Sequence, residues 1–494
     1  MPLPDLIEII PLTRPVRAEI TVPGSKSITN RALILAALAE GEVTLTGALW
    51  SEDTQIMTEC LQELGFMVDV RQDPNEACNR TITVYGKGGV IPPGGTESQP
   101  MELFVGNAGT AARFLAAFVC LGKGVYRLHG VPRMHERPQA ALFQALRELG
   151  YRVDSANDKL PVTIFGGEGK DAFHRVPNSK TENEDAVERV PTNRSCTVSI
   201  DQSSQFASAL LLCAKTGGWQ VEIVGENADE SPYVVMTSKM VEVFPKRGGT
   251  FQIEPDASSG SYFWAVDMLE VFYRADNGGN NTPPDNKMNW PVKVTNWPHT
   301  SGWQIDSKFP DSVSQFNRLN LFSSFMLADQ RGPNWREEIL LEEFPASIPP
   351  SSRKTDLGDS IMTLVVMAPT GFNRVEFSDL GRLRVQECER VVALRTELTK
   401  CGAKVIEEGD TLTVYPSQLH GAEIETYHDH RMAMCFAILG LKVPGIKIMN
   451  PACVKKTFPN FFQKLAAAPP HGLGATILDA KTGRKLSHEE LFAD

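Results

Sequence analysis

A lysine stands where the sequence otherwise predicts the start of a buried helix. Lys26 lies between Ser25 and Ser27 in the stretch GSKSITNR, directly ahead of the apolar run ALILAALA. Such a run predicts a buried helix, and a serine or threonine ahead of it is a typical N-cap. The positive end of the helix dipole disfavours a cation here unless an anion lies between them. We therefore interpret Lys26 as a ligand of a bound anion.

Similar polar residues precede other apolar stretches that are rich in small residues. They include Asn107, Gly109, Thr110, Ser203, Ser204, Gln205, Asp359, Asp429, His430 and Arg431. Basic residues recur at the same places, namely Lys26, Arg31, Arg113, Arg133, Arg384, Arg390, Arg431 and Lys456. One arginine near a helix start is usually a surface charge, but the recurrence favours helix starts that converge on one site for a ligand with several phosphate or carboxylate groups.

Two acids and two histidines accompany these cations. Asp359 and Glu387 read most simply as surface carboxylates, but a carboxylate among bound anions can have its pKa shifted for proton transfer. His428 and His430 flank Asp429 in HDHRM, which invites a metal interpretation. Because no second cluster of histidine or cysteine completes a ligand shell, we predict no metal at this site.

Bulk properties exclude several classes of protein. A chain of 494 residues predicts two or more domains, and a net charge of −11 argues against binding to nucleic acid or to an anionic membrane. No uncharged apolar run is long enough to span a bilayer, and the opening MPLPDLIEII lacks a leader pattern. Nine scattered cysteines without a C-x-x-C pair indicate reduced thiols. We expect a cytoplasmic protein.

One sequence pattern occurs in six copies along the chain. Each copy has small polar residues followed by an apolar stretch that predicts a helix. Most copies continue through a glycine-containing break into a strand of alternating apolar and polar residues. Several copies continue into a second helix that closes on LQELG, LRELG or LTKCG, where glycine suits a helix end. The chain thus predicts a pseudo-symmetric α/β protein with three units in each half. Residues 171–194 and roughly 274–354 interrupt the pattern and are interpreted as insertions, and the stretch after the final unit as a tail.

Seven ordered stretches carry a resemblance to a known family: PGSKSITNR, LFVGNAGTAARFL, VPRMHERP, DQSSQFASALLL, DASSGSYF, ETYHDHRMAMCFAI and KKTFPNFF. They resemble the enolpyruvyl transferases of the 5-enolpyruvylshikimate-3-phosphate (EPSP) synthase type over about residues 9–467. The resemblance implies a two-domain inside-out α/β barrel with six βαβαββ-type repeats, three per domain. The domains are expected at 25–253 and at 1–24 plus 254–468, with a tail at 469–494 and the active site between the domains.

The resemblance also implies a reaction, that of a 3-phosphoshikimate 1-carboxyvinyltransferase-like enzyme. A carboxylate or lysine protonates the methylene of phosphoenolpyruvate, a hydroxyl of the acceptor attacks the cationic carbon, and phosphate leaves. The substrates are small molecules, the protein is expected to be a monomer, and no metal or organic cofactor takes part. Domain closure is expected to exclude water from the site.

The family's functional residues carry over by position. The implied catalytic residues are Lys26, Asp359, Glu387 and His430. The implied ligands of phosphoenolpyruvate are Lys26, Asn107, Gly109, Arg133, Gln205, Arg390, Arg431 and Lys456. The implied acceptor ligands occupy Ser27, Arg31, Thr110, Ser203, Ser204, Tyr233, Glu230, Arg382 and Gln386.

Three of the acceptor positions depart from the family pattern. In RLRVQECER, Arg382 replaces an asparagine and Gln386 replaces a lysine, while Glu230 stands where the family has a serine. The family's lysine and serine bind the phosphate of shikimate 3-phosphate. The local change is about two charge units, each worth roughly 4 kcal/mol at about 4 Å and an effective dielectric near 20, before relaxation.

Three functions remain open at this point. The leading hypothesis is an enolpyruvyl transferase whose acceptor differs from shikimate 3-phosphate. The second is the ordinary synthase of aromatic amino-acid biosynthesis, with Arg382 replacing the missing lysine. The third is a relative that has lost the transfer reaction and binds or rearranges another anionic small molecule.

Overall fold

The computed structural model describes residues 2–167, 194–225, 231–276, 292–298, 302–331 and 348–493. These residues form two compact units. Unit 1 comprises Met1–Ser25, Pro74–Asn79 and Glu254–Asp494, and unit 2 comprises Lys26–Asp73 and Arg80–Ile253. Nearly all of the expected insertion at 171–194, parts of the one at 274–354, and Glu230 lie outside the described residues.

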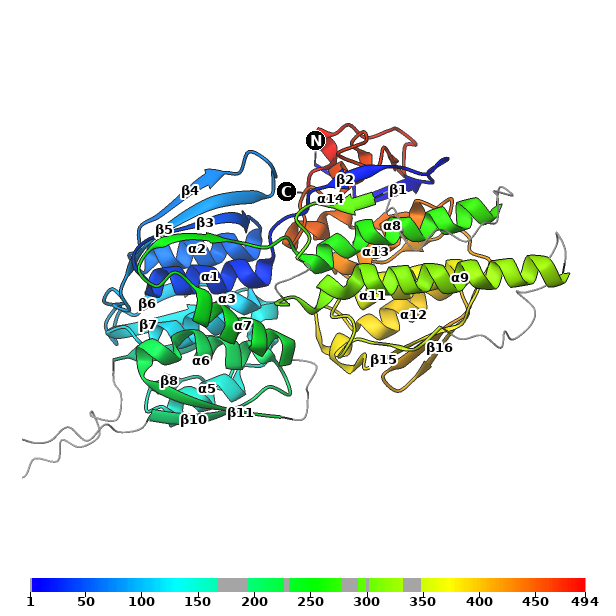
Figure 1. The fold of residues 1–494 in the computed structure, drawn as a ribbon. Coiled ribbons are helices and arrows are strands. Elements are labelled where there is room, and N and C mark those ends of the chain that lie inside the picture. The colour runs from blue at the N-terminus through cyan, green and yellow to red at the C-terminus, as the bar shows by residue number, and fades with distance from the viewer. Residues whose placement is uncertain are drawn as a thin grey trace, which may run out of the picture. The chain divides into compact units, whose positions relative to one another are not determined.

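Unit 2 contains helices and strands along its whole described length (Figure 1). Its helices are α1 (Lys26–Leu38), α2 (Glu52–Glu63), α3 (Gly109–Val119), α4 (Pro132–Glu136), α5 (Ala140–Glu148), α6 (Ser204–Gly217) and α7 (Ser231–Val243). Its strands are β3 (Glu40–Leu49), β4 (Val68–Gln72), β5 (Asn79–Lys87), β6 (Met101–Phe104), β7 (Gly124–His129), β8 (Arg152–Asp154), β9 (Val162–Gly166), β10 (Arg194–Ser199), β11 (Trp219–Val224) and β12 (Gly249–Gln252).

Unit 1 contains the two ends of the described chain. Its helices are α8 (Ala257–Asp276), α9 (Phe309–Arg331), α11 (Ile361–Met367), α12 (Arg390–Lys400), α13 (His430–Gly440) and α14 (Phe461–Ala466), with short 3-10 turns η3 (Ile305–Lys308), η4 (Ala368–Thr370), η5 (Gly381–Val385), η6 (Pro451–Lys456) and η7 (Glu489–Leu491). Its strands are β1 (Leu6–Ile10), β2 (Ala18–Ile20), β13 (Val292–Val294), β14 (Ser351–Ser352), β15 (Val375–Ser378), β16 (Val405–Glu408), β17 (Thr411–Val414), β18 (Glu423–Ile424), β19 (Lys447–Met449) and β20 (Thr476–Asp479).

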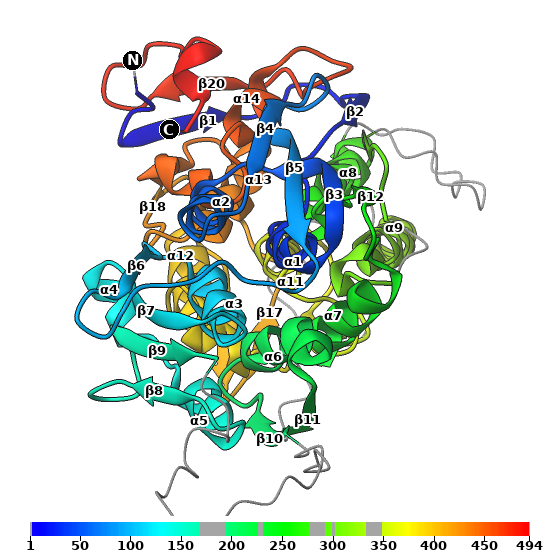
Figure 2. The same cartoon turned by 90° about the vertical axis from the view of Figure 1, so that its left-hand side faces the viewer.

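Each unit has three mutually packed helices at its centre. In unit 2 these are α1, α3 and α6, and in unit 1 they are α8, α11 and α13. Every residue of α3 and of α11 is buried, which is consistent with their mostly apolar sequences. Figure 2 shows the strands of unit 2 arranged outside its central helices. Helices inside and sheets outside confirm the predicted inside-out α/β fold.

The described residues form six sheets, three in each unit, and each contains a parallel pair of strands. In four sheets the pair is joined by one of the helices α3, α6, α11 and α13. In the other two the chain exchanges partners as it passes between units. Strand β2 leads into α1 and β3, but β3 pairs with β12, while β12 leads into α8 and β13, and β13 pairs with β2.

The repeated glycine phrases end helices as the sequence predicts. Gly65, Gly150 and Gly402 follow α2, α5 and α12, with φ values of 84°, 93° and 89°. A positive φ costs glycine little conformational free energy, whereas a residue with a Cβ atom pays a steric penalty there. The chain can therefore turn directly into β4, β8 and β16.

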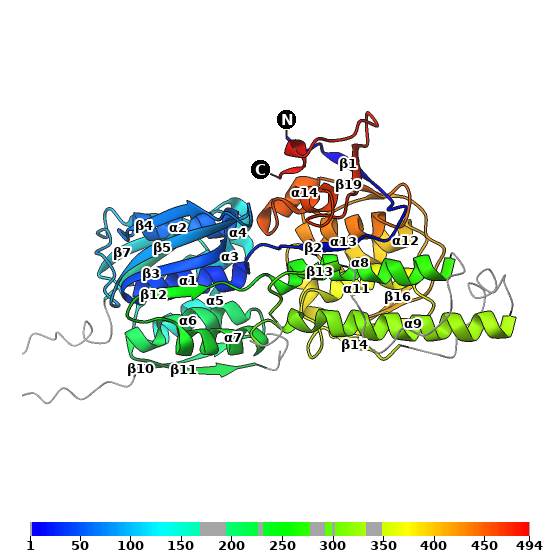
Figure 3. The ribbon, with the colours of Figure 1, turned by 45° about the horizontal axis from the view of Figure 1, so that its top comes forward.

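The stretch after the final repeat is part of unit 1 and not a detached tail. Within residues 469–494, strand β20 pairs antiparallel with β1 (Figure 2). Strand β19 pairs with β1 on its other side, and Figure 3 shows β1 and β19 together. Ile477 and Leu491 are each 1% exposed. Part of the expected insertion at 274–354 is equally integral, because β13 completes a sheet with β2 and α9 packs on α8. Among the described helices, none has both the length and the apolar composition needed to cross a membrane.

We predict that Ile477→Ala lowers the free energy of unfolding by roughly 2 to 5 kcal/mol, because it removes buried methyl groups and leaves a cavity. Chemical denaturation measures this change. Lys481→Ala, at an exposed position in the same stretch, is the control and should change stability by less than about 0.5 kcal/mol. Equal effects of the two substitutions would show that β20 is not packed on β1.

Candidate functional site

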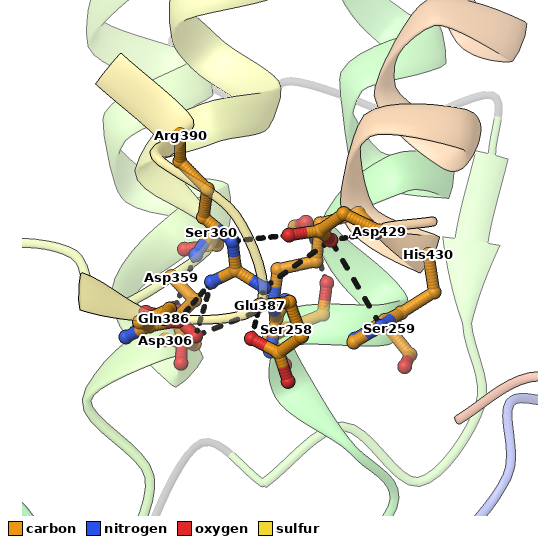
Figure 4. A network of polar contacts seen from close by, with 12 residues as sticks. Ser258, Ser259, Asp306, Asp359, Ser360, Gln386, Glu387, Arg390, Asp429 and His430 are labelled. Carbon is orange, nitrogen blue, oxygen red and sulfur yellow. Dashed lines mark hydrogen bonds and ion pairs between the residues drawn. The ribbon is translucent and has the colours of Figure 1, made fainter. Parts of the chain in front are cut away.

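Arg390 is the centre of a buried polar network in unit 1. It is the first residue of α12 and is 1% exposed. Its Nε donates to Oδ2 of Asp429 at 2.7 Å and its Nη2 to Oδ1 of Asp429 at 3.2 Å. Nη2 also meets Glu387 at 2.9 Å, and Nη1 meets Asp359 at 3.3 Å. Figure 4 shows Arg390 among these acids, which three different segments of unit 1 supply.

Three arginines converge on the carboxylate of Asp359. Oδ2 accepts from Arg431 at 3.2 Å and from Arg390 at 3.3 Å, while Oδ1 accepts from Arg353 at 2.9 Å. Burial alone would raise the pKa of Asp359, but the guanidinium groups of Arg431, Arg353 and Arg390 outweigh it and hold that pKa well below its usual range. Asp359 is therefore ionised at neutral pH.

Asp429 fixes the start of α13, which carries His430 and Arg431. Asp429 is fully buried, and its Oδ1 accepts the backbone N–H of Arg431 at 2.8 Å as the N-cap of the helix. Arg431 then reaches Ser258 through Nη2 at 3.0 Å. His430 is 3% exposed and its Nδ1 lies 3.9 Å from Asp429.

Three more predicted residues of unit 1, namely Glu387, Gln386 and Lys456, belong to the same network. Glu387 lies between two cations, since its Oε1 is 3.2 Å from Nζ of Lys456 and its Oε2 accepts from Arg390. Gln386 donates to Asp359 at 3.4 Å and accepts from Arg390. Arg382 is on η5, four residues before Gln386.

Lys26 has a protein partner, which its sequence context did not reveal. Its ammonium lies 3.0 Å from Oδ2 of Asp53, whose side chain is 5% exposed. Asp53 is in the first turn of α2, where the helix dipole favours an acid. Asp53 thus compensates the charge of Lys26 at the start of α1, and an anion at Lys26 remains a prediction.

Arg31 is held inside unit 2. Its three donor atoms reach Thr237 at 2.7 Å, Ser208 at 2.9 Å and the carbonyl of Ser27 at 2.8 Å. It is 2% exposed, and its guanidinium lies over the ring of Phe114. These contacts join α1 to α6 and α7, so Arg31 has a structural role whether or not it contacts an acceptor.

The other predicted residues of unit 2 fall into separate groups. Gln205 donates to Thr110 at 3.2 Å and accepts from Arg113, which links the starts of α3 and α6. Ser203 caps α6, and Ser204 is the first residue of that helix. The carbonyl of Tyr233 accepts from Thr237 at 2.8 Å.

Asn107 and Gly109 lie beside Arg137. The carbonyl of Asn107 accepts from Nη1 of Arg137 at 3.3 Å, and a Cβ atom on Gly109 would meet that guanidinium at 2.7 Å. Arg133 is on the short helix α4, where its mostly exposed side chain pairs with Glu136 at 2.5 Å. Within the described residues, Arg133 thus has no polar contact with the other predicted ligands of unit 2.

Sequence reasoning missed two members of the unit 1 network. Arg353 and Asp306 lie in the region that the sequence set aside as an insertion, and Asp306 accepts the backbone N–H of Ser360 at 2.8 Å. Burial raises the pKa of Asp306, and the nearby charge of Arg431 partly opposes this. Asp429 was placed at a helix start but not among the site residues, although an aspartate directly ahead of an apolar helix is a typical N-cap.

The network is suited to binding a carboxylate. Arg390 and Arg431 converge on a single carboxylate oxygen of Asp359, in a setting where both guanidinium groups are nearly shielded from water. Charge-assisted hydrogen bonds of this kind are stronger than neutral ones. Within the described residues, no group of three or more histidine, cysteine or acidic residues has the arrangement of a metal site.

An EPSP synthase and another enolpyruvyl transferase are among the solved structures that match this fold. EPSP synthase from Acinetobacter baumannii matches with a TM-score of 0.60 and 19% identity, covering 93% of this chain and 97% of that one. The enolpyruvyl transferase NikO from Streptomyces tendae matches with a TM-score of 0.57 and 15% identity over 97% of this chain and 99% of that one. At these identities the likeness establishes the fold.

Sequence comparison establishes the family. The family model described as EPSP synthase (3-phosphoshikimate 1-carboxyvinyltransferase) matches residues 11–245 and 352–465. The 3-phosphoshikimate 1-carboxyvinyltransferase of Trichormus variabilis is 36% identical over 482 residues, and that of Opitutus terrae is 34% identical over 493; the matches cover 93% and 94% of this chain and 98% of each relative. The chain belongs to the EPSP synthase family and is a transferase of the enolpyruvyl type.

We predict that the free energy of unfolding falls more between pH 7 and pH 3 in the wild type than in Asp359→Asn. Asp359 has a depressed pKa in the folded state, so its charge stabilises the fold in full above its unfolded pKa of about 3.9, and this stabilisation is lost as pH falls toward the folded pKa. At pH 3 the unfolded carboxyl is mostly protonated while the folded one stays ionised, which lowers the stability of the wild type by about 1 kcal/mol relative to pH 7. Denaturant unfolding at the two pH values measures the difference.

Arg353→Gln is the matched comparison, because it breaks one buried ion pair, at a cost of roughly 3 to 5 kcal/mol at neutral pH, but keeps the carboxyl of Asp359 paired with Arg390 and Arg431. Its fall in stability between pH 7 and pH 3 should therefore stay close to that of the wild type. An equal fall in the wild type and in Asp359→Asn would contradict the depressed pKa of Asp359.

Proposed function

We propose that this transferase moves the enolpyruvyl group of phosphoenolpyruvate to a hydroxyl of a small-molecule acceptor other than shikimate 3-phosphate. The observation that supports the donor half is the convergence of Arg390 and Arg431 on one carboxylate oxygen of Asp359. A carboxylate of the substrate can replace that oxygen while Asp359 keeps Arg353. The donor's carboxylate thus has two guanidinium ligands, as the family resemblance implies.

The proposed proton transfers follow from the charges around each carboxylate. Asp359 is held ionised, so it is suited to orient the acceptor hydroxyl by accepting a hydrogen bond and is poorly suited to donate a proton. The proton that the hydroxyl loses as it attacks leaves with the departing phosphate. Lys456 and Glu387 are 3.2 Å apart, which allows a proton to pass between them. We assign to this pair the protonation of the donor's methylene carbon and the later removal of a proton from it as phosphate leaves.

Gln386 is the residue that supports an acceptor other than shikimate 3-phosphate. It stands where the family pattern has a phosphate-binding lysine, and its amide hydrogen bonds to both Asp359 and Arg390. An amide contributes no charge toward a phosphate dianion. The loss of that charge favours an acceptor that is unphosphorylated or carries its phosphate elsewhere.

A second candidate is the 3-phosphoshikimate 1-carboxyvinyltransferase reaction of aromatic amino-acid biosynthesis. Relatives with that name are 34 to 36% identical over most of the chain. In this case Arg382, on the turn before Gln386, would supply the missing positive charge. The predicted substrate contacts of Lys26, Gln205 and the other unit 2 residues apply equally to both candidates. The monomeric state and the cytoplasmic location also remain predictions from the sequence.

The two candidates differ in phosphate release. We expect the wild-type protein to release phosphate from phosphoenolpyruvate slowly with shikimate 3-phosphate, and the variant Gln386→Lys with Glu230→Ser to bind shikimate 3-phosphate at least roughly tenfold more tightly, which equals about 1.4 kcal/mol. Gln386→Met, with no added charge, is the control and should give no gain. Phosphate release at an ordinary rate by the wild type would instead establish the second candidate.

Arg431→Gln is expected to raise KM for phosphoenolpyruvate roughly 30-fold, because a hydrogen bond to a charged group is worth about 1.5 to 3 kcal/mol. Steady-state phosphate release with a competent acceptor measures it. Arg395→Gln is the matched control, since Arg395 is on the same unit but pairs with Glu407 near the surface. An unchanged KM in Arg431→Gln would remove Arg431 from the donor site.

A further inference from the structure

Helix α12 carries a second buried charge that the proposed chemistry does not use. Glu397 is fully buried. Its Oε1 accepts from the phenol of Tyr427 at 2.8 Å, and its Oε2 accepts from the backbone N–H of Glu425 at 3.1 Å. Lys400 reaches both oxygens, at 2.8 and 2.9 Å. The carboxylate therefore has partners on both oxygens, and two of them come from one short segment.

That segment has an unfavourable backbone directly before the site. Tyr427 and His428 both have φ of 54°, in the left-handed region, and Asp429 follows. A residue other than glycine in such a conformation costs on the order of 1 to 3 kcal/mol and persists only where its surroundings hold it. Two such residues in succession need a strong external restraint.

Helix α12 supplies this restraint at two points. Arg390 and Glu397 are seven residues apart and so lie on the same face of the helix. Arg390 binds Asp429 at one end of the segment, and Glu397 binds Glu425 and Tyr427 at the other. The left-handed pair is thus held between two attachments to one rigid helix.

The segment determines where the functional groups of α13 and η6 lie. Asp429 caps α13 and so fixes Arg431, while Nδ1 of His428 lies 2.7 Å from Nδ2 of Asn450. Asn450 directly precedes η6, the turn that ends at Lys456. A change in the backbone at Tyr427 and His428 would therefore move Arg431 and Lys456 relative to Arg390.

We propose that Glu397 is a positioning residue of this transferase: it holds residues 425–428 in their left-handed turn so that Arg431 meets the substrate carboxylate together with Arg390. The inference rests on the proposed function, because it takes Arg390 and Arg431 as the carboxylate ligands. Burial, and then the hydrogen bond to Glu397, raise the pKa of Tyr427 well above its ordinary value, so the phenol keeps the proton that it donates.

The first test is Glu397→Gln, which keeps the size of the side chain but places an amide N–H₂ against groups that donate. We expect KM for phosphoenolpyruvate to rise at least tenfold with a smaller change in kcat, while circular dichroism remains that of the wild type. Glu490→Gln is the matched control, since Glu490 is also a buried glutamate in an ion pair, with Arg484 at 2.8 Å, in the C-terminal stretch. Its KM should be unchanged.

The second test separates positioning from general destabilisation. His428→Gly removes the backbone penalty at one of the two left-handed residues, and it also removes the contact with Asn450, so KM values are compared within this background. In the His428→Gly background, Glu397→Gln should raise KM less than threefold. If the tenfold effect persists undiminished in that background, Glu397 does not act through the turn and the proposal is overturned.

A third readout does not depend on activity and so distinguishes failure of this inference from failure of the proposed function. In Glu397→Gln without substrate, the backbone amide of Arg431, which Asp429 caps, should exchange its hydrogen at least tenfold faster than in the wild type. If Glu397→Gln does not fold, Tyr427→Phe, which removes one hydroxyl group, takes its place. Unchanged exchange and unchanged KM in an active enzyme would overturn the proposal. If the wild-type enzyme proves inactive with phosphoenolpyruvate, unchanged exchange alone would overturn the positioning role.

Discussion

The structure of unit 1 depends on burying three arginines together with the acids that neutralise them. Arg353, Arg390 and Arg431 are all largely shielded from water, and each donates to Asp359. Charges of this kind are costly to bury unless they are paired and hydrogen bonded. The segments that carry them must therefore meet in one arrangement, and removing any partner leaves an uncompensated charge. The same arrangement leaves two guanidinium groups directed at a carboxylate position.

The inside-out fold makes such a network possible. The central helices α3 and α11 are buried along their whole length and mostly apolar, and Arg390, Asp359 and Asp429 of this network lie at or just before helix starts. In unit 1 the starts of α12 and α13 bring Arg390, Asp429 and Arg431 together, and the residues just before α11 bring Asp359. Asp429 serves both as the N-cap of α13 and as the partner of Arg390, which couples helix formation to the geometry of the site.

Most of the fold could be predicted from local patterns, because the repeats present the same signals. Glycines at helix ends and small polar residues before apolar runs have physical roles that hold wherever they occur. The exchange of β2 and β12 between sheets could not be predicted, since it depends on pairing between strands distant in sequence. For the same reason the C-terminal stretch was predicted to be a tail outside the domains. Nothing in the local sequence TILD of β20 shows that it pairs with LIEII of β1.

The sequence predicted the site residues where a charged residue stands close to the start of an apolar helix. Arg390, Arg431 and Glu387 were found as charges near helix starts, and they do lie in one network. Asp53 was not foreseen as the partner of Lys26, because an acid at the start of a helix is ordinary and its distance from Lys26 in the sequence hides the pairing. Arg353 and Glu397 carried no signal at all. Their roles come from burial and from partners that only the folded chain brings near.

We propose above all that Arg390 and Arg431 together bind the carboxylate of phosphoenolpyruvate. In the structure, the position of that carboxylate is taken by Oδ2 of Asp359. The most direct measurement is a crystal structure of the protein with phosphoenolpyruvate bound. The account predicts that the substrate carboxylate lies about 3 Å from the guanidinium nitrogens of both Arg390 and Arg431, with Asp359 still bound by Arg353. Phosphoenolpyruvate bound with its carboxylate away from both arginines would contradict it.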